Sequence, residues 1–187
     1  MSPVHACSVA HWHAPLLRHT TTPFLHGWLT HTGSLTQRLI HRLGDFHVQR
    51  LHQHRARCLA DEAQAVGLVY PQQVMERDVL LYCHDRAVVY AHTVLPLDAN
   101  AGQWPLFSGL GNRSLGTMLF QDPLVRRGSL HFARLRPDHP LMQRVHRQSL
   151  HLPPTLSLMA RRSLFTRRGS SLLVTEVFLP ALAAFGS

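Results

Sequence analysis

The sequence contains no lysine and few acidic side chains, and both shortages limit the kinds of partner that the chain can bind. All 19 of its lysine-or-arginine positions are arginine, and with only 10 acidic residues the formal net charge is +9. Such a surplus admits acidic partners, from nucleic acid to small carboxylates. Because lysine is missing while histidine occurs 16 times, the balance points to codon bias rather than to a selected basic surface. We therefore expect no nucleic-acid partner.

Cysteines and long apolar runs are also scarce. An odd cysteine count without a CxxC pair is typical of a reducing compartment. The most apolar stretch, residues 172–185, is interrupted by a charge and a proline and is too short to span a bilayer. Histidine and arginine interrupt the first 22 residues, where a secretory signal would be apolar. These absences predict a soluble cytoplasmic protein. The three cysteines are Cys7, Cys58 and Cys83.

The remaining composition is that of a globular chain. With 187 residues, of which 45% are hydrophobic and 16% charged, the chain can bury a core without disulfides or metal ions. No internal repeat or low-complexity linker divides it. We expect a loosely ordered lead-in over residues 1–22, which show no clear period, and one domain over residues 23–187.

Local patterns predict helices among antiparallel strands. Residues 34–43 predict a helix, because Ser34 is a good N-cap and Gln37 completes a capping box. This helix is expected to end at Gly44. Ser114 is expected to cap a second, short helix. A proline-broken loop is expected over residues 137–154. The predicted strands, several linked by tight turns, cover residues 46–51, 74–83, 87–95, 129–135, 155–166 and 171–179. This pattern predicts an α+β fold on an antiparallel sheet.

Two charged residues fall on apolar faces of separate predicted strands. Because side chains alternate along a strand, Glu176 and Arg77 each share a face with large apolar residues. A carboxylate there must be paired, protonated or directed into a polar cavity, and a guanidinium offers a planar fork for a carboxylate. Each could also belong to a structural ion pair, even with the other. Together they predict an enclosed site for a small anion that also bears a hydroxyl group.

Further groups could add to such a site. The backbone N–H groups of Leu35 and Leu115 lie in predicted first turns, where amides lack intrahelical partners. Arg161 and Arg162 could add positive potential, although such a pair more often lies on a solvated face.

Two histidine pairs are candidate metal ligands. The pairs at residues 11 and 13 and at residues 52 and 54 have metal-ligand spacing, but they lie in polar segments without a nearby cysteine or carboxylate cluster. Chance pairs are expected among 16 histidines. We predict no metal site.

Short segments spread in order over about residues 28–180 carry a resemblance to a known family. They are WL at 28–29, GSLTQR at 33–38, RDVLL at 77–81, TVLP at 93–96, LG at 110–111, SLG at 114–116, LF at 119–120, RRS at 161–163 and LLVTEVFLP at 172–180. In this set the chain resembles the chorismate pyruvate-lyase family of bacterial ubiquinone biosynthesis. The closing strand is the best single match.

The resemblance implies an antiparallel sheet whose covering helices enclose a small-ligand pocket, without cofactor or metal. It implies that Arg77 grips the ring carboxylate of substrate and product, helped by the backbone N–H groups of Leu35 and Leu115. Glu176 would accept the hydrogen bond of the ring hydroxyl, so Arg77 and Glu176 are the catalytic candidates. The implied reaction removes pyruvate from chorismate to give 4-hydroxybenzoate. The enclosed pocket also favours a monomer.

The alternative is a non-catalytic domain that binds small aromatic acids. A similar fold serves as the effector-sensing domain of a family of bacterial transcription regulators, which carry a helix-turn-helix before the sensor. The 22-residue lead-in is too short to hold one, which favours the enzyme. Two departures from compact family members are expected: a longer stretch over residues 126–155 and a histidine-rich N-terminus.

Overall fold

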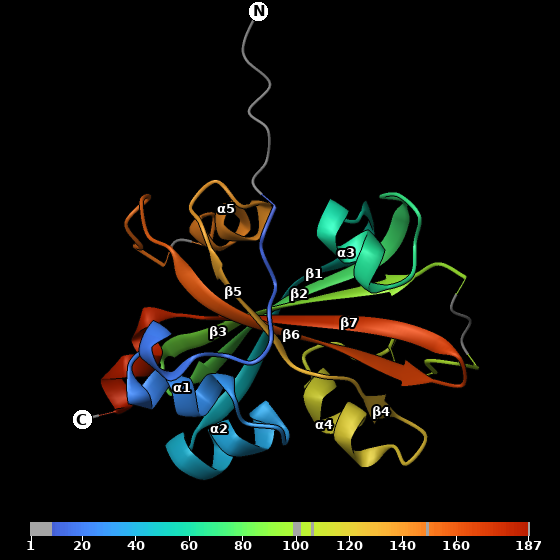
Figure 1. Ribbon diagram of the computed structural model, residues 1–187. Helices are drawn as coiled ribbons and strands as arrows, with labels where there is room; N and C mark the ends of the chain where they lie inside the picture. Colours follow the sequence, from blue (N-terminus) through green and yellow to red (C-terminus); the bar gives the residue numbers. More distant parts are fainter. Residues whose placement is uncertain (1–8, 99–101, 106, 149, 187) are drawn as a thin grey trace, which may run out of the picture.

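A seven-stranded sheet forms the centre of the fold in this computed structural model (Figure 1). The structure describes residues 9–98, 102–105, 107–148 and 150–186. The strands are β1 (Phe46–Arg57), β2 (Gln73–Cys83), β3 (Arg86–Pro96), β4 (Arg126–Arg127), β5 (His131–Leu135), β6 (Leu158–Arg167) and β7 (Ser170–Phe178). Their order is β1-β2-β3-β7-β6-β4, β5 also pairs with β6, and every pairing is antiparallel. The α+β fold class is confirmed.

Helices cover both faces of this sheet (Figure 1). On one side lie α1 (Pro23–Leu29), α2 (Leu35–Leu43) and α4 (Leu115–Gln121). On the other side lie α3 (Ala60–Ala65) and α5 (Pro140–His146), and two 3-10 helices, η1 (Arg18–Thr20) and η2 (Pro180–Phe185), complete the described elements. Because successive side chains of a strand point to opposite faces, the long central strands β2, β3, β6 and β7 contribute side chains to two separate interiors.

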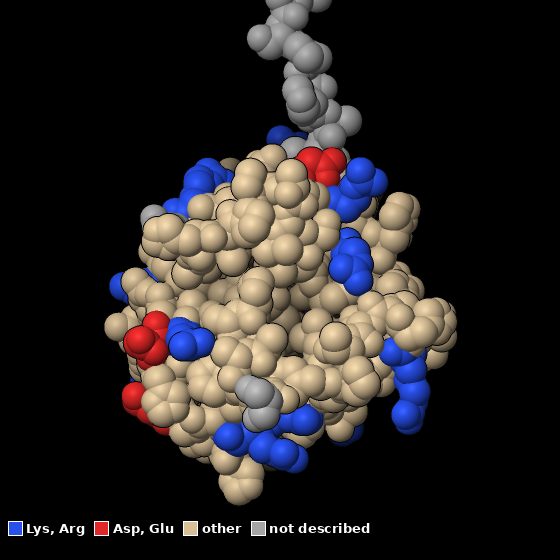
Figure 2. Space-filling model, turned by 90° about the vertical axis from the view of Figure 1, so that its left-hand side faces the viewer, with Lys and Arg blue, Asp and Glu red and all other residues tan. Residues whose placement is uncertain are grey.

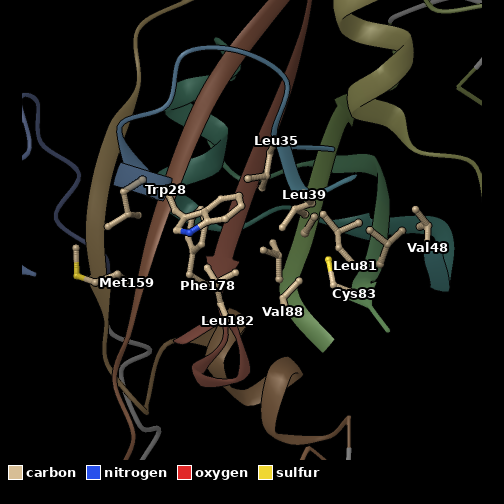
Figure 3. Packing of buried hydrophobic residues seen from close by; sticks show 14 of the residues in the cluster. Trp28, Leu35, Leu39, Val48, Leu81, Cys83, Val88, Met159, Phe178 and Leu182 are labelled. Atoms are coloured by element: carbon tan, nitrogen blue, oxygen red, sulfur yellow. The ribbon is translucent and has the colours of Figure 1, made fainter. Parts of the chain in front are cut away.

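Each of the two interiors contains a cluster of buried apolar side chains. Beneath α1 and α2, Trp28 and Leu39 belong to one buried cluster with Leu81 of β2 and Phe178 of β7 (Figure 3). On the opposite face, α5 buries three apolar side chains against the sheet, namely Leu141, Met142 and Val145. Burial of this kind stabilises a fold by ~25 cal/mol per Å² of apolar surface removed from water.

Most predicted elements are confirmed. Ser34 caps α2 by accepting a hydrogen bond from the Gln37 N–H, and Gly44 ends this helix with a φ of 69°. Ser114 caps α4 by accepting from the Thr117 N–H. The two predicted hairpins are β2–β3 and β6–β7.

Other segments differ from the predictions. The strand expected over residues 46–51 continues to Arg57, and the patterns did not predict α1 or α3. The loop expected over residues 137–154 contains α5. Its prolines do not prevent a helix, because Pro140 occupies the first turn, where no N–H is needed. The ring of His139 caps this turn by accepting a hydrogen bond from the Leu141 N–H.

Within the expected lead-in, the structure describes residues 9–22. His13 forms a β-bridge with Phe132 of β5, and Leu16 is buried in the cluster beneath α1. Cys7 lies outside the described residues, whereas Cys58 and Cys83 are buried free thiols. In the described part of the chain, no helix has the length and apolar character needed to cross a membrane.

Charged side chains on the molecular face shown in Figure 2 are dispersed. Arginines lie at separate places around this face and are interrupted by acidic side chains and uncharged surface. A continuous basic stripe, which is the usual footprint of nucleic-acid binding, is not present on this face.

Candidate active site

A pocket lies between α2, α4 and the sheet. It contains about 600 Å³ of space not filled by protein atoms, part of which is open solvent. Its walls are mainly apolar and include Leu35, Val48, Val79, Leu81, Leu119 and Phe165. Among the described lining residues, the charged ones are Arg77, Arg127, Arg161 and Glu176. Positive charge therefore exceeds negative charge, and the pocket favours an anion.

Arg77 projects from β2 into this pocket without a carboxylate partner in the described part of the chain. Its Nη2 donates hydrogen bonds to the carbonyls of Gly111 (3.1 Å) and Arg113 (3.0 Å). Its buried Nε has no hydrogen-bond partner among the described residues. Burial, together with the charge of Arg50, lowers the pKa of Arg77 to about 10, so the side chain stays charged at neutral pH. Loop carbonyls thus fix a guanidinium whose charge is not compensated.

The N-termini of α2 and α4 meet at the same pocket. Thr36 Oγ1 and Ser114 Oγ form a hydrogen bond of 2.6 Å that joins the two helix starts. Gly116 permits this approach, because a Cβ there would lie 2.8 Å from Thr36 Oγ1. Leu35 and Leu115 are the first residues of these helices and both line the pocket. First-turn amides have no intrahelical acceptor, so they can donate to a bound anion.

Glu176 enters the pocket from β7 and is held by Arg161, its register partner on β6. Arg161 Nε donates to Glu176 Oε2 at 2.5 Å. Arg161 is only 1% exposed, and its Nη1 donates to the carbonyls of Trp28, Leu29 and His31. The carboxylate is therefore ionically paired, and its position is fixed by an arginine anchored to the end of α1.

Two alternatives left open by the sequence are wrong. Arg77 does not pair with Glu176, since Arg161 holds that carboxylate. Arg161 does not lie on a solvated face, because its side chain is buried and lines the pocket. Arg162 points to the other face, where its Nη1 lies 3.2 Å from Asp61 Oδ2.

Arg127 is a pocket residue that sequence patterns missed. It belongs to β4, which has two residues, so no alternation exists from which to predict the direction of its side chain. Its Nε donates to Ser163 Oγ (2.9 Å) and its Nη1 to the Thr32 carbonyl (2.7 Å). Burial and the charge of Arg161 lower the pKa of Arg127 to about 10. A second cation without a carboxylate partner in the described chain therefore lines the pocket.

The opposite face of β2 carries a separate buried polar network. Arg144 of α5 holds the Glu76 carboxylate, with Nη1 at 2.8 Å from Oε2. Asp78 accepts hydrogen bonds from the Tyr90 hydroxyl and from His92 Nδ1, the latter at 2.5 Å. The charged groups of this network are thus paired with one another.

Two sets of three side chains at this network have ligand atoms close enough together to bind one metal ion. The first set is His52, His54 and Glu76, and the second is Glu62, Glu76 and His92. The prediction that His52 and His54 lack a nearby carboxylate is wrong, because the longer β1 aligns them with Asp78 and Glu76 of β2. Arg144 already holds the Glu76 carboxylate, so a metal ion at either group would have to displace a guanidinium.

Comparison with known sequences assigns the family. Residues 6–184 match the model of a family described as chorismate lyase. The chain belongs to this family. A probable chorismate pyruvate-lyase of Cupriavidus metallidurans is 46% identical over 174 residues, which is 92% of this chain and 81% of the relative. Another, of Nitrosospira multiformis, is 41% identical over 181 residues, covering 96% of this chain and 98% of the relative.

Solved structures share the fold of this chorismate lyase family member. The effector domain of PhnF from Mycobacterium smegmatis superposes with a TM-score of 0.57 at 13% identity, covering 80% of this chain and 90% of that domain. The ligand-binding domain of a GntR-family regulator from Bordetella bronchiseptica gives 0.51 at 17% identity, covering 73% and 86%. Similarity at such identity shows the fold alone. It agrees with the expected likeness to effector-sensing domains.

Proposed function

We propose that this chain is a chorismate pyruvate-lyase, which converts chorismate into 4-hydroxybenzoate and pyruvate as the first step of ubiquinone biosynthesis. The observation that carries the proposal is the charge of the pocket in a member of this family. Three arginines and one glutamate line it, and chorismate is a dianion with two carboxylates. An apolar pocket with this surplus of positive charge complements such a ligand.

Arg77 binds the ring carboxylate in this proposal. Its buried Nε has no partner among the described residues, and a guanidinium N–H can donate a charge-assisted hydrogen bond to a carboxylate. The first-turn amides of Leu35 and Leu115 add donors from two sides. Glu176 accepts the hydrogen bond of the ring hydroxyl, with the Arg161 ion pair holding its carboxylate in place.

The proposed reaction is an internal transfer within bound chorismate. The ether bond between the ring and the enolpyruvyl group breaks while hydrogen from the hydroxyl-bearing ring carbon passes to the methylene of that group. The departing group becomes pyruvate, and the ring becomes aromatic. Because aromatisation makes this step strongly downhill, the protein acts mainly by holding the substrate diaxially and by electrostatics. Glu176 polarises the hydroxyl as it becomes a phenol.

The second candidate function is binding of a small aromatic acid without turnover. It is supported by the fold shared with regulator effector domains, at TM-scores of 0.57 and 0.51. The same charged residues of the pocket could bind an aromatic acid in a sensor domain. Only turnover of chorismate therefore distinguishes the lyase from the sensor.

The deciding experiment is incubation of the purified protein with chorismate, followed by chromatographic measurement of both products. The lyase proposal predicts equal amounts of 4-hydroxybenzoate and pyruvate, formed faster than in a protein-free control. Binding of 4-hydroxybenzoate without turnover would favour the sensor. Absence of both binding and turnover would contradict both candidates.

We further propose that the enzyme acts as a cytoplasmic monomer without nucleic acid. The proposal of a monomer follows from a pocket that α2 and α4 close against the sheet. The buried free thiols of Cys58 and Cys83 suit a reducing compartment. Light scattering at micromolar concentration should give the mass of a single chain.

A further inference from the structure

Arg127 has no role in the binding scheme above, although it lines the same pocket. We propose that Arg127 binds the second carboxylate of the substrate, the one on the enolpyruvyl group that leaves as pyruvate. This inference rests on the proposed lyase function and deepens it, because it assigns a separate subsite to the departing part of the substrate.

The first argument is the number of uncompensated cations. Glu176 neutralises Arg161, but Arg77 and Arg127 have only neutral oxygen acceptors within the described chain. Arg77 is almost completely buried, and Arg127 is half-buried. A cation withdrawn from water without a counter-ion is costly in free energy, so its presence points to a ligand that supplies the missing charge. Two such arginines in one pocket match the two carboxylates of chorismate.

The second argument is the position of Arg127 along the pocket. Arg127 donates to Ser163, two residues beyond Arg161 and on the same face of β6, and Arg161 pairs with Glu176. The charges of both Arg161 and Glu176 act on the pKa of Arg127. Arg127 therefore lies towards the Glu176 end. In chorismate the enolpyruvyl ether is attached beside the hydroxyl-bearing carbon, so its carboxylate lies at that end too.

The third argument is that the Arg127 guanidinium is already oriented. Ser163 Oγ and the Thr32 carbonyl hold two of its nitrogens. Its central carbon lies 5.6 Å from the ring centres of both Phe120 and Phe165. Aromatic packing leaves the edge of a guanidinium available for hydrogen bonds, so little conformational freedom is lost when a carboxylate binds there.

This assignment separates substrate binding from product binding. The aromatic product retains the ring carboxylate and the hydroxyl but not the second carboxylate. Arg127 therefore contributes to binding of chorismate, whereas Arg77 contributes to binding of both chorismate and 4-hydroxybenzoate.

The test compares Arg127→Met with Arg126→Met, a matched control on the same strand whose side chain is exposed. The readouts are kcat/KM for chorismate and the Kd of two aromatic ligands, 4-hydroxybenzoate and 3-carboxymethoxy-4-hydroxybenzoate. The second ligand carries an additional carboxylate beside the hydroxyl. Arg127→Met should lower kcat/KM and the dicarboxylate affinity by roughly 10- to 100-fold, the loss of one charged hydrogen-bond partner. The Kd of 4-hydroxybenzoate should stay within about twofold of wild type, and Arg126→Met should change none of these values.

The inference is overturned if Arg127→Met weakens both aromatic ligands equally, which would indicate a general role in pocket shape, or weakens neither. Arg127→Lys provides a second variant that keeps the charge and loses the planar fork, and it should weaken the dicarboxylate by a smaller factor. A wild-type protein that binds the aromatic ligands without turning over chorismate would contradict the lyase proposal. The dicarboxylate comparison would then still decide whether Arg127 forms the subsite.

Discussion

Arg77 and Asp78 are neighbours on β2, both almost completely buried, but they meet different surroundings on the two faces of the sheet. Arg77 faces the pocket and finds only two loop carbonyls and an unpartnered Nε among the described residues. Asp78 faces α5 and accepts hydrogen bonds from Tyr90 and His92. Among the described residues, one face thus has a buried charge without a counter-ion, and the other pairs its charges internally.

The network around Asp78 shows how the internal neutralisation works. Burial alone would raise the pKa of the Asp78 carboxyl, but His92 and the surrounding hydrogen bonds lower it well below its usual range. His92 Nε2 also lies 3.0 Å from Glu62 Oε1. Burial disfavours the charged ring of His92, yet these two carboxylates raise its pKa well above 6.5. We infer that charges in this network stabilise the fold, whereas the unpaired arginines of the pocket serve binding.

Removing the Asp78 charge should lower the free energy of unfolding more than the other substitutions considered below. Asp78→Asn leaves His92 and Arg144 with one counter-charge fewer, and breaking a buried ion pair typically costs ~3–5 kcal/mol. Urea unfolding measures the difference. Asp85→Asn, in the exposed β2–β3 turn, is the control and should match wild type. A loss below ~1 kcal/mol for Asp78→Asn would show that the network is not a main source of stability.

Glu176→Gln should lower the free energy of unfolding less than Asp78→Asn does. Among the described lining residues of the pocket, Glu176 is the carboxylate, and Arg161 pairs with it. Arg161 keeps its three carbonyl acceptors, so the chain should still fold. The lost charged hydrogen bond should lower the free energy of unfolding by about 1–3 kcal/mol, and chorismate turnover should be lost. Full activity with unchanged product affinity would remove Glu176 from its proposed role.

The smallest expected effect is the change with pH in the contribution of His92 to stability. A group whose folded pKa lies above its unfolded value of 6.5 stabilises the fold fully below that value and loses its contribution as the pH rises towards the folded pKa. The stability difference between wild type and His92→Gln should therefore be largest near about pH 6 and shrink towards about pH 9. Urea midpoints across this range test the trend, and a difference that grows with pH would contradict it.

The sequence carried enough information to predict Arg77 and Glu176 as site candidates. Each is a lone charge on an apolar face of a long strand, and alternation on β2 and β7 fixes which way it points. The two serine caps likewise predicted the helix starts at Leu35 and Leu115. These signals are local, so one chain segment suffices to detect them.

The partners of these groups could not be predicted, because they depend on contacts between distant segments. The pairing of Glu176 with Arg161 follows from the β6–β7 register. The approach of His52 to Asp78 follows an irregularity between Arg50 and His52 in the β1–β2 pairing, and such bulges shift which residues face one another.

The most direct test of the difference between the two faces is a 4-hydroxybenzoate titration of Arg77→Met, followed by urea unfolding alongside wild type and Asp78→Asn. Without ligand, we predict that Arg77→Met unfolds within about 1 kcal/mol of wild type or is more stable, because it removes a buried charge that lacks a counter-ion. We also predict that 4-hydroxybenzoate stabilises wild type and Asp78→Asn but not Arg77→Met. If Arg77→Met is as unstable as Asp78→Asn and is still stabilised by the ligand, Arg77 stabilises the fold as Asp78 does. That result would contradict a ligand-binding role for Arg77.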